Sequence, residues 1–158
     1  MKRMAPGFTI IELLVVMSVL AILATAAMPL VEMTARRNKE RDLKQAVAEI
    51  RKAIDAYKLA ADAGKLGAAA TGGGVSGYPP SLSVLVQGVT DGGGGQAMYF
   101  LRRLPRDPFG DPKLAPEKSW GLRAYSSSAE DPKEGADVYD VYSTSEAVGM
   151  NGVPYRQW

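Results

Sequence analysis

An acidic residue, Glu12, stands near the start of a run that is otherwise largely apolar from Phe8 to Met28. A carboxylate inside a bilayer costs about 2.5–3.5 kcal/mol on insertion scales, so its usual role is functional and it needs a cationic partner at the same depth. Cleavage of the chain between Gly7 and Phe8 would create such a cation, a new α-amino group close to Glu12. In an assembly of these chains, the amine of one helix can pair with the acid of another. The pattern therefore predicts a subunit of an assembly.

A short basic leader precedes the apolar run, and the order of residues is Met1-Lys2-Arg3-Met4-Ala5-Pro6-Gly7 followed by Phe8-Thr9-Ile10-Ile11-Glu12-Leu13-Leu14-Val15-Val16. This segment resembles the class III signal of type IV pilins and type II secretion pseudopilins. In that family a prepilin peptidase cuts after the glycine and methylates the new N-terminal phenylalanine, roles that the resemblance assigns to Gly7 and Phe8. It also implies that Glu12 recruits subunits into a filament and that Pro29 bends the helix.

Two other interpretations of the N-terminus stay open. A secretory signal peptide would use Lys2 and Arg3 as its basic region and residues 24–26 as an A-x-A-like cleavage site. Glu12 would interrupt the apolar region of that signal, and the Gly7 to Phe8 junction would have no role in it. A plain single-pass anchor is also compatible, because about 21 apolar residues at about 1.5 Å each span a hydrocarbon core of about 30 Å.

The composition argues against catalysis and against nucleic-acid binding. The 158 residues include no cysteine and no histidine, so disulfides, thiolate metal sites, lipoprotein acylation and histidine-based catalysis are absent. We therefore expect no enzyme, and a net charge of +2 is too small to indicate a nucleic-acid partner. Basic residues gather on one segment, where they face lipid headgroups or pair with acids of neighbouring subunits: Arg36, Arg37, Lys39 and Arg41.

After Pro29 the pattern stays helical but becomes one-sided. Apolar residues recur at spacings of three and four, which is typical of an amphipathic helix: Leu43, Val47, Ile50, Ile54 and Tyr57. Gly64 is the expected stop, so we predict a leader at 1–7 and a helix over 8–63, which is transmembrane over 8–28 and amphipathic over 29–63. Its apolar stripe is expected to pack on a globular head formed by 64–158.

The head is predicted to be small and to mix helix with strand. Ser81 is the expected N-cap of a short helix with apolar residues on one side: Leu82, Leu85 and Val86. Glycine-rich stretches are expected to be loops: 64–77 and 91–95. Two strand-like runs, 120–127 and 137–143, flank a polar turn and predict an antiparallel hairpin. The predicted fold is α+β, a long N-terminal helix packed on a small antiparallel sheet in the manner of pilins.

A proline-rich segment at 99–112 forbids a regular helix or central strand. Its order Leu101-Arg102-Arg103-Leu104-Pro105-Arg106-Asp107-Pro108-Phe109-Gly110 resembles a signature of the major pseudopilin of type II secretion. That resemblance implies a homopolymer in the bacterial inner membrane, with its head in the periplasm, that drives protein export. Implied partners are the prepilin peptidase, minor pseudopilins and an inner-membrane assembly platform. A type IV pilin and a membrane-anchored binding domain that never polymerises are the alternatives.

The same resemblance implies a calcium site in the loop after the last strand. Oxygen-bearing residues lie in this loop or just upstream of it: Asp140, Ser143, Glu146 and Asn151. Calcium takes about six to eight oxygens, commonly from several carboxylates, and the loop itself carries one. Calcium therefore stays an open alternative to aromatic anchoring of this segment by Tyr155 and Trp158.

Overall fold

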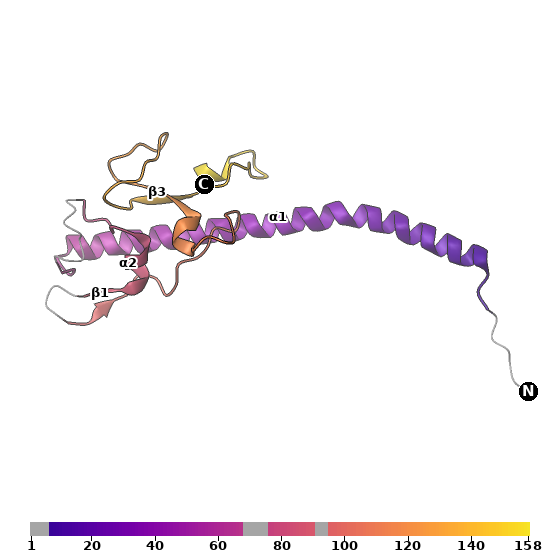
Figure 1. The fold of residues 1–158 in the computed structure, drawn as a ribbon, viewed down its shortest axis with the longest axis horizontal. Coiled ribbons are helices and arrows are strands. Elements are labelled where there is room, and N and C mark those ends of the chain that lie inside the picture. The colour runs from indigo at the N-terminus through magenta and orange to yellow at the C-terminus, as the bar shows by residue number, and fades with distance from the viewer. Residues whose placement is uncertain (1–6, 68–75, 91–94) are drawn as a thin grey trace, which may run out of the picture. The chain divides into compact units, whose positions relative to one another are not determined.

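A computed structural model describes residues 7–67, 76–90 and 95–158, except for the side chains of 26–29. The chain forms two compact units, Met1–Asn38 and Lys39–Trp158. Helix α1, Ile10–Asp62, contributes residues to both units (Figure 1). Apart from Gly7, the predicted leader lies outside the described residues, as do parts of both glycine-rich stretches.

Helix α1 ends where the sequence predicts. Gly64 has a positive φ of 67°, a conformation that glycine adopts without the steric cost of a Cβ atom. The amide of Lys65 donates to the carbonyl of Ala60 at 3.0 Å, and the amide of Gly64 donates to Ala61 at 2.9 Å. These bonds satisfy carbonyls that the last turn leaves free. The helix is continuous through Pro29, and the bend there stays a prediction.

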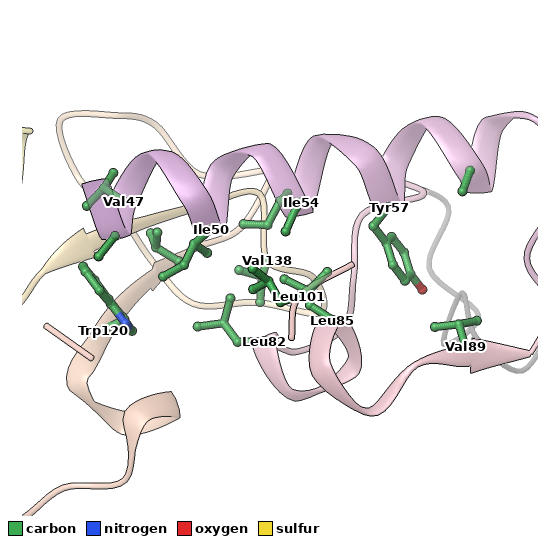
Figure 2. Close-up of a cluster of buried hydrophobic side chains, with 14 of the residues drawn as sticks. Val47, Ile50, Ile54, Tyr57, Leu82, Leu85, Val89, Leu101, Trp120 and Val138 are labelled. Atoms are coloured by element: carbon green, nitrogen blue, oxygen red, sulfur yellow. The ribbon is translucent and has the colours of Figure 1, made fainter. Parts of the chain in front are cut away.

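The core of the Lys39–Trp158 unit is built on the predicted stripe of α1. Its five residues are no more than 4% exposed: Leu43, Val47, Ile50, Ile54 and Tyr57. Figure 2 shows part of this stripe facing Leu82, Leu85 and Val138 from other segments of the unit. Burial also raises the pKa of Tyr57 above its ordinary value. The predicted packing of the amphipathic helix on the head is confirmed.

Short elements gather around the C-terminal part of α1 (Figure 1): α2 Leu82–Gln87, β1 Val89–Thr90, β2 Ala97–Met98, η1 Pro116–Ser119, β3 Trp120–Arg123, β4 Asp140–Ser143 and η2 Tyr155–Gln157. They form two antiparallel pairs, β1 with β2 and β3 with β4, so the α+β prediction is confirmed. The predicted hairpin is β3–β4, with Trp120 opposite Ser143, and its strands are shorter than expected. The β1–β2 pair was not predicted, because strands of two residues are too short to show an alternating pattern.

The short helix after Ser81 is confirmed with Ser81 at its N-cap, but the side-chain hydrogen bond usual for that position is absent. Ser81 occupies the N-cap position of α2 without a side-chain hydrogen bond to the helix. Its hydroxyl instead lies 2.9 Å from the hydroxyl of Ser83. The two serines therefore satisfy each other, which is a local competition that a capping pattern alone does not reveal.

The proline-rich segment joins separate parts of the head. All of residues 101–112 are described, and none lies in a helix or strand. Asp107 is 3% exposed, and its carboxylate accepts from the amide of Phe109 at 2.8 Å and from the Ser143 hydroxyl at 2.6 Å. The indole of Trp120 donates to the carbonyl of Pro105 at 2.9 Å. The segment thus ties the β3–β4 hairpin to the surrounding loops.

We expect Leu43→Ala to lower the free energy of unfolding by about 2–5 kcal/mol, because it leaves a cavity in a closely packed core. Leu59→Ala is a matched control, since Leu59 lies on the same helix and is 70% exposed. That control should change stability by no more than about 0.5 kcal/mol. Denaturant unfolding of the two variants measures the difference, and equal losses would contradict the assigned core.

Asp107→Ala should destabilise the head by about 1–3 kcal/mol, because it leaves the Ser143 hydroxyl and the Phe109 amide without their acceptor. Asp111→Ala is the comparison, since Asp111 is exposed and its carboxylate accepts a hydrogen bond from the amide of Lys113 alone among the bonds described for that side chain. Thermal unfolding of both proteins tests the assignment. A smaller loss for Asp107→Ala than for Asp111→Ala would show that the buried bonds contribute little.

Candidate functional site

The N-terminal part of α1 exposes apolar side chains on every face. Four consecutive residues are between 50% and 58% exposed: Leu13, Leu14, Val15 and Val16. Consecutive helical residues point about 100° apart, so these four cover the whole circumference. None of the side chains described from 7 to 39 is buried. A helix that is apolar on every face is stable only where lipid or protein shields it from water. By length and composition, α1 could cross a membrane.

The hydroxyl groups in this part of α1 are satisfied by the helix itself. Ser18 donates to the carbonyl of Leu14 at 2.8 Å, and Thr25 donates to the carbonyl of Ala21 at 2.8 Å. Such bonds remove most of the cost of placing a hydroxyl in hydrocarbon. Glu12 is the one ionisable side chain between Ile10 and Leu30, so its charge is the polar feature left to explain.

Glu12 has a local role that the sequence analysis missed. Thr9 lies just before Ile10, the first helical residue. The Thr9 hydroxyl accepts a hydrogen bond from the backbone amide of Glu12 at 3.3 Å. Threonine followed three residues later by glutamate is the sequence pattern of a capping box, so the signal was present. An acid in the first turn also interacts favourably with the helix dipole. The Glu12 side chain itself is exposed and available to another chain.

Gly7 and Phe8 lie ahead of α1 in backbone without regular structure. Phe8 is 79% exposed, and a Cβ atom added at Gly7 would meet nothing within 4 Å. The junction between them is therefore accessible to a peptidase. Phe8, which cleavage would make the N-terminal residue, precedes Glu12 by four positions in the sequence. Cleavage at this junction, methylation of Phe8 and pairing of Glu12 stay predictions.

The calcium candidates do not share one site. Asp140 and Ser143 both lie on β4, three positions apart, so they point to opposite faces of the strand. Both carboxylate oxygens of Asp140 accept from arginine: Oδ1 from Nε of Arg51 at 2.6 Å, and Oδ2 from Nη2 of Arg123 at 3.1 Å. The Ser143 hydroxyl is buried and donates to Asp107. Two arginines beside Asp140 also oppose a divalent cation by charge.

The other two calcium candidates, Glu146 and Asn151, do not form a cluster of carboxylates with each other. Asn151 is exposed, and its Oδ1 accepts from the amide of Val153 at 3.1 Å. Glu146 is exposed in the loop after β4. Within the described residues, no group of three or more histidine, cysteine, aspartate or glutamate side chains could hold a metal ion. The donor set therefore does not fit calcium, which requires about six to eight oxygens.

Comparison with known proteins agrees with the N-terminal segment and extends over most of the chain. Residues 2–28 match the family described as the prokaryotic N-terminal methylation motif. Over 146 residues the chain is 31% identical to the type II secretion system core protein G of Pseudomonas aeruginosa, covering 86% of this chain and 92% of that protein. Over 115 residues it is 33% identical to the protein of the same description from Aeromonas hydrophila, covering 70% of this chain and 72% of that one.

No solved structure gives a significant match. The methylation motif includes Gly7, Phe8 and Glu12, and the two relatives also extend over the head. On this identity and coverage, the chain belongs to the family of type II secretion system core protein G, the major pseudopilins.

Proposed function

We propose that this protein is the structural subunit of a pseudopilus, the filament of a type II secretion system, and that it polymerises through the N-terminal part of α1. One observation carries the proposal: this part of α1 is apolar on every face, uncovered, and carries one carboxylate close to its N-terminal end. Family membership supports the same role, since both relatives are named as core proteins of that secretion system.

Burial of the apolar surface drives assembly in this proposal. Before assembly, lipid covers Ile10 to Leu30, and in the filament neighbouring helices cover part of the same surface. Lipid tails are as apolar as these side chains, so burial alone gives little preference for one helix arrangement over another. A polar interaction at a fixed depth is needed to select the arrangement.

Glu12 supplies this interaction by pairing with the α-amino group of Phe8 on a neighbouring subunit. Two opposite charges about 4 Å apart gain roughly 4 kcal/mol at an effective dielectric constant of about 20. That gain is close to the cost of about 2.5–3.5 kcal/mol for placing the acid in a bilayer. The pair therefore adds little net affinity, and its main consequence is a fixed stagger between adjacent subunits.

The remaining steps follow from the same segment. A prepilin peptidase cuts after Gly7 and leaves Phe8 as the methylated N-terminus, and α1 anchors the subunit in the inner membrane. The Lys39–Trp158 unit then forms the periplasmic head and contacts the heads of adjacent subunits. Minor pseudopilins and an assembly platform complete the machine, and Pro29 is the position at which α1 bends.

The mature protein from the membrane fraction should begin at Phe8 and carry one additional methyl group. Mass spectrometry of the intact protein, together with its N-terminal sequence, measures both properties. A start near Ala27 or Met28 would instead indicate ordinary secretion by a cleaved signal peptide, and the proposal would be wrong.

Glu12→Ala and Glu12→Gln should each reduce filament assembly by at least about tenfold, the effect of losing about 1.4 kcal/mol, because each leaves the Phe8 amine of a neighbouring subunit buried without its partner. Glutamine keeps a hydrogen-bonding group suited to a capping box but carries no charge, so the two variants separate capping from charge pairing. Recovery of sheared filaments measures assembly, and membrane fractionation checks that each variant is still inserted.

Glu32→Gln is the control, because Glu32 is an exposed acid on the same helix beyond the apolar run. It should assemble as the unaltered protein does. Normal assembly of Glu12→Gln would show that the charge is dispensable. Normal assembly of both Glu12 variants would favour a role for the chain that does not need this contact.

A further inference from the structure

The C-terminal segment, residues 144–158, is held against α1 although it contains little regular structure. One isolated bridge joins Val148 to Pro154, and the short helix η2 follows it. The amide of Gly149 donates to the carbonyl of Val153 at 2.8 Å, which closes a tight turn. Tyr155, immediately after the turn, is nevertheless only 1% exposed. An irregular segment needs specific contacts to remain packed in this way.

The first set of contacts comes from Glu40 of α1. One oxygen of its carboxylate, Oε1, accepts from the amide of Met150 at 2.8 Å and from the hydroxyl of Tyr155 at 2.9 Å. A single acid thus fixes both the turn and the buried tyrosine. Hydrogen bonds to an ionised acceptor are stronger than neutral ones, so this contact is well suited to holding a loop.

The second set comes from Arg51, eleven positions further along α1. Its guanidinium donates to Asp140 through Nε at 2.6 Å and to the backbone oxygen of Trp158 through Nη2 at 2.9 Å. Eleven residues correspond to three turns, so Glu40 and Arg51 lie on the same face of the helix. The planar guanidinium can serve both partners because its N–H groups have a fixed geometry.

Aromatic contacts accompany these two sets of polar contacts. Tyr155 stacks on Phe109 with 4.1 Å between ring centroids, and Trp158 meets Tyr155 edge-on at 5.0 Å. The ammonium of Lys44, on α1 between Glu40 and Arg51, lies 4.5 Å from the centroid of the Trp158 ring. A side chain at Gly149 would come within 2.4 Å of that ring, so the close packing requires glycine there.

We propose that this C-terminal latch, formed by Glu40, Arg51, Asp140, Tyr155 and Trp158, replaces a divalent cation as the device that fixes the segment to the head. Asp140, the one carboxylate on β4, has both oxygens paired with arginine side chains. Arg51 joins β4 to the C-terminal segment through Asp140 and Trp158. A cation bound by both would make the same connection. The head therefore folds and keeps its C-terminal segment packed without calcium.

The test compares the melting temperature of the full-length protein in detergent with calcium and with the chelator EGTA. The proposal predicts a difference of less than about 1 °C. A cation bound at a hundred times its Kd would raise the melting temperature of a protein of this size by roughly 5–10 °C, so the two results are easily separated. A calcium-dependent rise of that size would overturn the proposal.

Asp140→Asn and Glu40→Gln each weaken the latch, and each should lower the melting temperature by the same amount in calcium and in EGTA. Both should also speed tryptic cleavage after Arg156, which reports release of the segment itself. Glu146→Gln is the matched control, since Glu146 is an exposed acid in the same segment and is not one of the residues that form the latch. A destabilisation by Asp140→Asn or Glu146→Gln that appears only in calcium would show that these acids bind the ion.

Discussion

Packing of the apolar stripe of α1 is the interaction on which the head depends. The strands of the head are two or four residues long, and its other helices are short. Such elements cannot form a stable core among themselves, because an isolated two-stranded pair is at best marginal in water. They become stable by covering one continuous surface from Leu43 to Tyr57, which the long helix presents without a break. Loss of that surface would remove the partner with which residues of α2, β1, β3, β4 and η2 form one buried cluster.

The same helix therefore has two different environments along its length. Its C-terminal part hides one face in the head and exposes charged residues on the other, whereas its N-terminal part is apolar all round. The first arrangement folds a subunit, and the second leaves a surface that only lipid or other subunits can cover. Glu12 matters because it is the one charge in that surface, and the hydrogen bond from its amide to Thr9 shows that it also belongs to the start of the helix.

The C-terminal segment is held to the head by polar contacts and by aromatic packing. A cation can hold a loop by binding several carboxylates, but here the Asp140 carboxylate of β4 is paired with two arginine side chains. Exposed ion pairs contribute little to stability, and Arg51 is 41% exposed. The buried Tyr155 ring and its hydrogen bond to Glu40 are therefore as important to the latch as the arginine. Polar contacts set the position of the segment, and aromatic burial stabilises it.

The sequence by itself determined the long helix, the stripe on α1, the hairpin, the end of the helix at Gly64 and the N-terminal motif. These features depend on residues close together in the chain, through helical spacing, strand alternation and backbone preference. Only the tertiary structure decided that Asp140 binds Arg51 and that Glu40 binds Tyr155, because these partners are separated by 89 and 115 positions. It likewise placed Asp107 in a buried network with Ser143. An acidic side chain has the same local pattern whether it binds a cation, an arginine or a hydroxyl, so its partner is fixed only when distant segments meet.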